Sequence, residues 1–230
     1  MSAAGLVIIG AGGFGRETAR AALDGGYDGT LLGFLDDDPG LAGATVAGMP
    51  VLGPVAALAE LPDAQVIVAT GRPDNYTSRP RIVAGLGIDE ARWATVVHPG
   101  ASLASDTTVG PGSVLLAGVI ATAGVRIGSH AAVMPLVVLT HDVHVGDFAT
   151  IASAVALAGG VRVGDGAYLG AGTMVREGCS VGGWAMTGMA SLVLADVPPG
   201  RLWFGSPATD RDASPAAGFT LAALSGGTPG

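Results

Sequence analysis

The sequence has a single cysteine, no cluster of basic side chains and no long apolar run. Cys179 alone cannot form an internal disulfide framework. The 11 basic residues are outnumbered by 19 acidic ones, and a formal net charge of −8 excludes the basic footprint of nucleic-acid binding. No apolar run reaches the roughly 20 residues that span a membrane, and Met1 to Gly5 is too short and uncharged for a signal peptide. We therefore expect a cytoplasmic protein without nucleic-acid or membrane partners.

Aromatic and charged residues are also scarce, at 5% and 13% of the chain, whereas glycine is abundant at 39 residues. The hydrophobic share of 49% argues against disorder, because disordered chains lack the apolar content for a core. Many glycines together with many aliphatic residues favour a repetitive β architecture with tight turns.

A six-residue repeat fills most of the second half of the chain. From Val97 in steps of six, 15 of 17 positions are Val, Leu or Ile, without insertion or deletion. The residue two places earlier is small or β-branched, and the residue that follows is often glycine. The 17 positions are Val97, Leu103, Val109, Leu115, Ala121, Ile127, Val133, Leu139, Val145, Ile151, Leu157, Val163, Leu169, Val175, Val181, Thr187 and Val193.

Each hexad is interpreted as a short strand plus a turn, and three hexads close one triangular coil of 18 residues. The aliphatic residue points inward, and the glycine after it tolerates the positive φ of a tight corner. One hexad cannot bury its apolar side chain alone, so the stacking of coils supplies the core. The pattern predicts an uninterrupted β-helix from residue 95 to about 197. Pro198 and Pro199 should end it, because proline cannot donate to a ladder.

Strands and helices alternate before the repeat, which is typical of a small parallel α/β domain. Ligands of such sheets lie at the carboxyl ends of the strands. Here these ends are the Gly10–Gly15 loop, the pair Asp36-Asp37 and the segment Gly71–Pro73. The predicted elements are a strand at 6–9, a helix at about 16–23, a strand at 31–35, a short helix at about 54–61 after residues 51–53, a strand at 66–69 and a helix to about 85.

The glycine loop after the first strand reads Gly10-x-Gly12-x-x-Gly15, with acidic residues about 20 positions later, and this fits the dinucleotide fingerprint. The amides of such a loop and the following helix N-terminus favour a phosphate. An NAD site, a site for a nucleotide-linked substrate and a structural turn all remain open. Fewer than 95 residues precede the β-helix, which leaves no room for the second half of an NAD domain and favours the nucleotide-linked substrate. The candidate substrate-binding residues are Gly10, Gly12, Gly13, Phe14, Gly15, Asp36, Asp37, Gly71 and Arg72.

His141 and Asp142 are the candidate catalytic pair. In the hexad frame His141 follows the inward Leu139 by two places and faces outward on a corner, with Gly159 one coil beyond. Histidine suits a general base that takes a proton from an amine attacking a thioester. A carboxylate can hold the imidazole tautomer, and an amide such as that of Gly159 could stabilise the oxyanion. Taken alone, the pattern is more often that of a solvated surface histidine.

To about residue 209 the chain resembles the NeuD/PglD-like sugar O- and N-acyltransferases, which are hexapeptide-repeat enzymes. Each matching motif is weak singly, but their order and spacing together are fairly specific. The motifs are Gly10–Gly15, Phe34-Leu35-Asp36-Asp37, Gly71, Val97-His98-Pro99, Thr140-His141-Asp142 with Val145-Gly146-Asp147-Phe148, Ala158-Gly159-Gly160, and Gly205-Ser206-Pro207-Ala208.

The resemblance implies a left-handed β-helix, a His141 general base oriented by Asp142, and a contact of Gly159 with acetyl-CoA. We extend the predicted acetyl-CoA set to Ala171 and Gly188. The resemblance further implies that the Gly10–Gly15 loop and the Asp36-Asp37 pair hold a nucleotide-linked amino sugar. Family members are trimers with acetyl-CoA between adjacent β-helices, so we expect a homotrimer with active sites between subunits.

The chain also departs from the family's pattern. Members commonly carry Asn-Thr at Met134-Pro135, histidine at Thr150, glycine at Ala154 and polar residues where Arg72-Pro73 stand. These departures leave the fold intact and put the acceptor, and the acyl group, in question.

The sequence thus predicts a Rossmann-like α/β domain at 1–94, a left-handed β-helix at 95–209 and a flexible tail at 210–230. The predicted function is an acyl-CoA-dependent N-acyltransferase, with acetyl-CoA as co-substrate and no metal, that acts on a nucleotide-linked amino sugar or a similar small acceptor. The alternatives are an O-acyltransferase with a hydroxyl acceptor and a non-catalytic trimer that binds NAD or another nucleotide.

Overall fold

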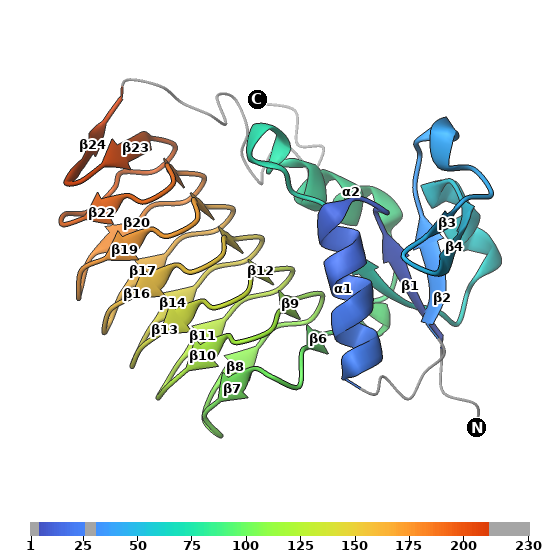
Figure 1. Cartoon of the computed structure of the whole chain (residues 1–230), viewed down its shortest axis with the longest axis horizontal. Coiled ribbons are helices and arrows are strands. Elements are labelled where there is room, and N and C mark those ends of the chain that lie inside the picture. The colour runs from blue at the N-terminus through green and yellow to red at the C-terminus, as the bar shows by residue number, and fades with distance from the viewer. Residues whose placement is uncertain (1–4, 26–30, 212–230) are drawn as a thin grey trace, which may run out of the picture.

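The computed structural model describes residues 5–25 and 31–211, which form an α/β domain followed by a β-helix (Figure 1). The α/β sheet has the strand order β3-β4-β2-β1-β5, with all neighbours parallel except the β3–β4 hairpin. Its strands are β1 (Leu6–Ile9), β2 (Leu31–Leu35), β3 (Thr45–Val46), β4 (Met49–Gly53) and β5 (Gln65–Val68). The helices are α1 (Gly13–Asp24) and α2 (Ser78–Leu86), with 3₁₀ turns at Pro39–Leu41, Val55–Glu60, Pro73–Asn75 and Glu90–Arg92.

Alternate residues of β1 pack into the apolar clusters on the two faces of the sheet, as expected for a sheet buried on both faces. Leu6 and Ile8 pack with α1 and the first coils of the β-helix, whereas Val7 and Ile9 pack with the residues around α2. The α/β prediction is confirmed, with three differences in its elements. Helix α1 begins at Gly13 within the glycine loop, the helix predicted near 54–61 is a 3₁₀ turn, and β3 was not predicted.

The β-helix contains 17 two-residue strands at six-residue intervals, and the second residue of each strand is the predicted inward position. They are β6 (Val96–Val97), β7 (Ser102–Leu103), β8 (Thr108–Val109), β9 (Val114–Leu115), β10 (Ile120–Ala121), β11 (Arg126–Ile127), β12 (Ala132–Val133), β13 (Val138–Leu139), β14 (His144–Val145), β15 (Thr150–Ile151), β16 (Ala156–Leu157), β17 (Arg162–Val163), β18 (Tyr168–Leu169), β19 (Met174–Val175), β20 (Ser180–Val181), β21 (Met186–Thr187) and β22 (Leu192–Val193).

Three sheets enclose the core of this β-helix, and their strands are parallel except for the last strand of one sheet. The domain-facing sheet runs β6-β9-β12-β15-β18-β21 and ends in β23 (Leu202–Gly205) and the antiparallel β24 (Ala208–Asp210). The apolar sheet runs β7-β10-β13-β16-β19-β22, and the polar sheet runs β8-β11-β14-β17-β20. They meet at a first corner between the domain-facing and apolar sheets (residues 134–137 and their equivalents 18 apart), a second between the apolar and polar sheets (140–143), and a third between the polar and domain-facing sheets (146–149).

The glycine that follows each inward residue has a different role from the one predicted. Positive φ occurs two residues later, at Gly112 and also at non-glycine residues such as Asp142. At Gly110 a Cβ atom would lie 2.6 Å from the backbone of Gly128 in the next coil, and Gly170 stands equally close to the next coil. These glycines therefore permit the close stacking of coils, which any side chain would prevent.

The coil continues beyond the two prolines. Strand β23 (Leu202–Gly205) stacks in parallel on β21, and β24 (Ala208–Asp210) folds back against it. Asp210 lies in β24 and forms an ion pair with Arg201 at 2.9 Å. The remainder of the predicted tail, 212–230, lies outside the described residues.

The α/β domain packs against the domain-facing sheet. Figure 1 shows α1 standing beside β6, β9 and β12, and Val96 and Val114 belong to the same apolar cluster as Leu6 and Phe34. Further along the sheet, the hydroxyl of Tyr76 donates to the carbonyl of Trp184 at 3.0 Å. No helix in the described part of the chain is long and apolar enough to cross a membrane.

Candidate active site

The glycine loop opens one side of a cavity of about 490 Å³ at the carboxyl ends of β1, β2 and β5. The amide of Gly10 donates to the carbonyl of Leu35 at 2.8 Å, and a Cβ at Gly10 would meet the carbonyl oxygen of Ala69. Around Gly12 and Gly13 a Cβ would meet nothing within 4 Å. These two glycines therefore leave free space beside the backbone at the start of α1. The cavity is lined by Gly10, Gly12, Gly13, Phe14, Asp36, Ala69, Thr70, Gly71, Arg72, Asn75, Ser78 and Ile82.

The start of α1 offers this cavity an anion-binding surface. No acidic residue stands in its first turn and Gly12 caps it without a side chain, so no side chain of the helix itself pairs with its first amides. The carboxylate of Asp36 accepts the amide N–H groups of Ala11 at 2.7 Å and Asp38 at 2.9 Å, which fixes the loop. A phosphate group fits this arrangement.

Two predicted substrate-binding residues do not line the cavity. A Cβ at Gly15 would lie 1.9 Å from the carbonyl oxygen of Gly10, so this glycine allows α1 to pack on the loop. Asp37 uses its carboxylate to accept the amide of Val55 at 2.8 Å. Both residues therefore support the loop and do not face the ligand space.

Gly71 and Arg72 do line the cavity. Gly71 has φ +140, a conformation that favours glycine. Arg72 is exposed and pairs with Asp74 at 2.6 Å. Exposed ion pairs contribute little free energy, so Arg72 can exchange Asp74 for a ligand phosphate at small cost.

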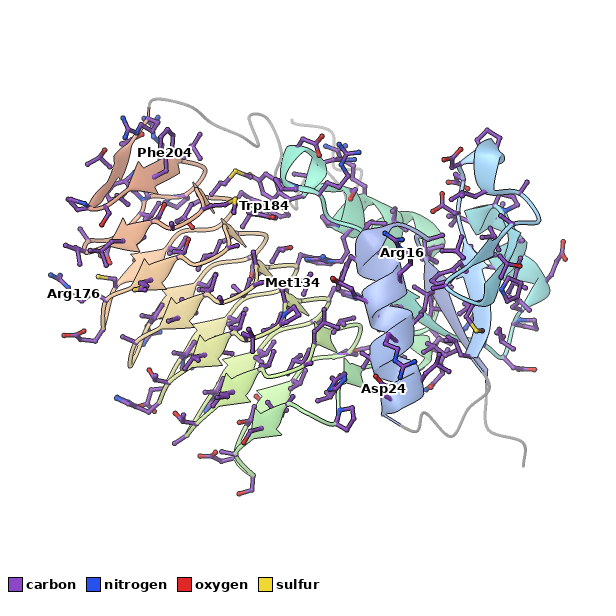
Figure 2. All side chains as sticks on the ribbon, in the orientation of Figure 1. Arg16, Asp24, Met134, Arg176, Trp184 and Phe204 are labelled. Carbon is purple, nitrogen blue, oxygen red and sulfur yellow. The ribbon has the colours of Figure 1, made fainter. Side chains whose placement is uncertain are left out.

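A second, smaller cavity of about 130 Å³ lies between the α/β domain and the domain-facing sheet. Phe14 and Gly71 line both cavities. The remaining walls of the smaller one come from Arg79, Ala132, Met134, Thr150, Ala152, Ser153, Tyr168 and Ala171. Figure 2 shows Met134 on the side of the β-helix that faces α1.

The catalytic pair is joined at the second corner. The Nδ1 atom of His141 lies 2.9 Å from a carboxylate oxygen of Asp142, which favours the tautomer with the proton on Nδ1. The Nε2 atom is then unprotonated and extends over the next coil, because a Cβ at Gly159 would lie 2.3 Å from it. Asp142 takes φ +60, which aspartate tolerates better than most residues. The predicted stacking of His141 on bare Gly159 is thus present.

The predicted acetyl-CoA residues lie on two borders of the apolar sheet. Gly159 is at the second corner, and Gly160 next to it donates to the carbonyl of His141 at 2.9 Å. Ala171 and Gly188 are at the first corner, where Phe204 of β23 covers Gly188 at the Cβ position. One chain does not bring the three residues together.

One chain also separates His141 from the two cavities. The larger cavity lies in the α/β domain, and the smaller one lies between that domain and the domain-facing sheet. The second corner is the edge of the β-helix opposite that sheet. Arg176, at the same corner two coils beyond Thr140, points away from the α/β domain in Figure 2. The acceptor space and the candidate base therefore lie on opposite sides of the β-helix.

Two of the other histidines, His130 and His98, have structural roles. His130 is buried between Trp93, with ring centroids at 4.7 Å, and Phe148, at 5.0 Å. Burial, assisted by the charge of Arg79, lowers the pKa of His130 to about 4. The Nδ1 atom of His98 accepts the amide of Gly100 at 2.8 Å. Within residues 5–25 and 31–211 no group of three or more His, Cys, Asp or Glu could hold a metal ion.

Sequence reasoning missed Arg79, whose guanidinium is buried where α2 meets the β-helix. An arginine in an amphipathic helix is normally solvated, so no local pattern in the sequence distinguishes it.

Comparisons with known proteins show what the chain is similar to. Residues 5–85 match the family model of the PglD N-terminal domain. A search of curated proteins gives no significant match. The acetyltransferase domain of PglB from Neisseria gonorrhoeae in complex with acetyl coenzyme A is similar over 90% of this chain and 98% of its own, with 29% identity and a TM-score of 0.79.

A histidine-to-asparagine mutant of perosamine N-acetyltransferase from Caulobacter crescentus, in complex with CoA and GDP-perosamine, covers 92% of this chain and 98% of its own. Its identity is 29% and its TM-score is 0.81. These matches span both the α/β domain and the β-helix, and they confirm the prediction that the β-helix is left-handed. The resemblance to the NeuD/PglD-like sugar acyltransferases is thus confirmed, and the chain is an acetyltransferase, as its sequence predicted.

Proposed function

We propose that the protein transfers an acetyl group from acetyl-CoA to the amine of a nucleotide-linked amino sugar, with His141 as general base. The observation that carries the proposal is the His141–Asp142 pair, whose free Nε2 extends over Gly159 on an open corner. The ligands of similar structures, acetyl-CoA in one and CoA with GDP-perosamine in another, support the two substrates.

The chemistry needs only groups that the chain supplies at this corner. Nε2 of His141 takes a proton from the amine as its nitrogen attacks the thioester carbonyl. Asp142 stabilises the resulting imidazolium. The amide of Gly159, which donates no hydrogen bond among the described residues, can stabilise the oxyanion. The C–S bond then breaks, the imidazolium returns its proton to the CoA thiolate, and no covalent enzyme intermediate forms.

The larger cavity is where the nucleotide part of the acceptor would bind. The amides at the start of α1 would hold the diphosphate, and Arg72 could add a charge contact. The sugar would extend past Phe14 and Gly71 into the smaller cavity. The sheet ends at β5 and so offers one nucleotide-binding half, which fits a nucleotide sugar better than NAD.

A second copy of the chain is needed to bring His141 to the acceptor, and we propose a homotrimer. The outward residues of the apolar sheet are apolar except Ser102, and Ile120 and Met174 remain 42% and 58% exposed in one chain. Those of the polar sheet are polar or charged. A continuous exposed apolar face marks an interface.

The geometry of a three-fold axis then completes the site. If the apolar sheets of three parallel β-helices face the axis, the first corner of each copy meets the second corner of the next. This places His141 and Gly159 of one copy against Ala171 and the smaller cavity of its neighbour. The acetyl-CoA residues that one chain separates would then share one groove.

Purified protein incubated with acetyl-CoA and a panel of nucleotide-linked amino sugars tests the proposal, with released CoA thiol and product mass as readouts. His141→Ala is expected to lower kcat by about 10²–10⁴ with the oligomer intact. His98→Ala, which removes a histidine outside the site, is the matched control. Acetylation that proceeds equally in His141→Ala would remove His141 from the mechanism.

The same assay separates N- from O-acylation, because hydroxylamine cleaves an ester product and leaves an amide. A product cleaved by hydroxylamine would favour the hydroxyl acceptor. Tight NAD binding in calorimetry, with no CoA binding and no transfer, would favour the non-catalytic trimer.

A further inference from the structure

Arg79 is a buried cation at the junction of the α/β domain and the β-helix. It lies in α2, its relative exposure is 1%, and it is among the largest fully buried side chains of the described residues. Burial lowers the pKa of Arg79 to about 10, so the group stays charged at neutral pH. In the described part of the chain no carboxylate pairs with it.

Hydrogen bonds from Arg79 connect both parts of the molecule. Its Nη1 donates to the carbonyl of Thr70 at 2.9 Å, in the loop that follows β5. Its Nη2 donates to the carbonyl of Phe148 at 2.8 Å and to the hydroxyl of Thr150 at 2.9 Å, with Ala149 O at 3.2 Å. These three acceptors belong to the third corner of the β-helix and the start of β15.

A guanidinium suits this bridge better than any other side chain. Burying a cation is costly unless its donors are satisfied, and here Nη1 and Nη2 both donate while the buried Nε has no partner among the described residues. The planar fork of arginine carries several donors in fixed directions, so one group can hold a loop carbonyl and the β-helix acceptors at a set separation. A lysine or glutamine could not make the same contacts at once.

The bridged loop lies between the two cavities. Thr70 and Gly71 line the larger cavity, Gly71 also lines the smaller one, and Arg79 and Thr150 form part of the smaller one's wall. A Cβ at Gly71 would lie 3.1 Å from Nη1, so the guanidinium packs directly against the loop backbone. A shift of the Arg79 side chain would therefore move this loop and change the position of the larger cavity relative to the smaller one.

We propose that Arg79 is a positioning residue, which fixes the loop at 70–75, on the border of both cavities, to the β-helix and so sets where the acceptor amine lies relative to the acyl donor. The proposal rests on the proposed function for its catalytic consequence. It predicts that the loop at 70–75 loosens without Arg79, while the surface that holds the diphosphate, at the start of α1, is unaffected.

The test compares Arg79→Lys and the milder Thr150→Val with Arg126→Lys, which changes an exposed arginine on the polar sheet. Calorimetry with UDP, GDP and dTDP identifies the nucleoside diphosphate that the wild type binds. In Arg79→Lys the Kd for this nucleoside diphosphate and the KM for acetyl-CoA are expected to stay within threefold of the wild-type values. The kcat for the amino sugar should fall about 30–100-fold. Thr150→Val should lower kcat about 3–10-fold, and Arg126→Lys should change none of these values.

If Arg79 only stabilises the fold, nucleotide binding and kcat should fall together, because a partly unfolded population lowers both the stoichiometry of nucleotide binding and kcat. That result, or an unchanged kcat in folded Arg79→Lys and Thr150→Val, would overturn the proposal. Amide hydrogen exchange gives a readout that needs no activity. Exchange in residues 70–75 should quicken in both variants while β5 is unchanged, and equal exchange in that loop would refute the bridge. Absence of acetyl transfer in the wild type would instead refute the proposed function.

Discussion

Gly159→Ala tests whether the free nitrogen of His141 must stand where the structure has it. The added Cβ would lie 2.3 Å from Nε2 and 2.4 Å from Cε1 of the imidazole, far inside van der Waals contact. The backbone at Gly159 has no positive φ, so the methyl group itself brings no backbone strain. The imidazole must therefore rotate away from the second corner.

The magnitude of the effect follows from exposure. The side chain of His141 is 68% exposed, so the ring can turn into solvent and stability should change by less than about 0.5 kcal/mol. Displacement removes general-base catalysis, which contributes about 10²–10⁴ in rate. We expect kcat to fall by about 10²–10³, equivalent to about 3–4 kcal/mol in activation free energy.

The assay is thiol release from acetyl-CoA at saturating acceptor, with thermal unfolding measured beside it. Gly100→Ala is the matched control, because its Cβ would lie 3.1 Å from Nδ1 of His98, a histidine outside the site. It should leave kcat within twofold. A folded Gly159→Ala protein with wild-type kcat would show that the base does not act from above Gly159.

Four further changes probe other parts of the molecule. Gly12→Val should weaken nucleoside diphosphate binding at least about tenfold in calorimetry with an unchanged melting temperature, because its side chain enters open cavity space. Gly15→Ala should instead destabilise the fold by about 1–3 kcal/mol through overpacking. His130→Phe should reduce acid sensitivity. The folded-state pKa of about 4 lies below the usual 6.5, so stability is lost as pH falls from about 6.5 towards 4, and the wild type should lose about 2–3 kcal/mol more than His130→Phe in urea unfolding between pH 7 and 4.5. Met174→Glu should place a charge in the apolar face and yield monomers without activity in light scattering and thiol release, and an active monomer would refute the shared site.

The β-helix could be predicted from the sequence because its period is fixed. Once Leu139 is assigned inward, the hexad places His141 on a corner and Gly159 one coil beyond, and both are found there. The role of the following glycines was not predictable from one hexad. It depends on the approach of the next coil, as at Gly110, and that distance exists only after stacking.

The α/β loop shows the limit of a motif. The fingerprint names three glycines without separating their roles, whereas the structure assigns Gly12 to the cavity and Gly15 to helix packing. Asp37 likewise matches the pattern and yet holds the amide of Val55. Arg79 could not be found because its acceptors at Thr70 and Phe148 are far apart in sequence.

The departures from the family's pattern gather on one side of the molecule. Met134 and Thr150 line the smaller cavity, Arg72 lines the larger one, and Ala154 turns the first corner with φ +58. Thr150 also accepts a hydrogen bond from Arg79, so a change there alters how the two parts are held. None of the four stands at the second corner, where His141 meets Gly159. Variation at Met134, Thr150 and Arg72 would therefore change which acceptor fits, and the sugar is the component to vary first when the substrate is sought.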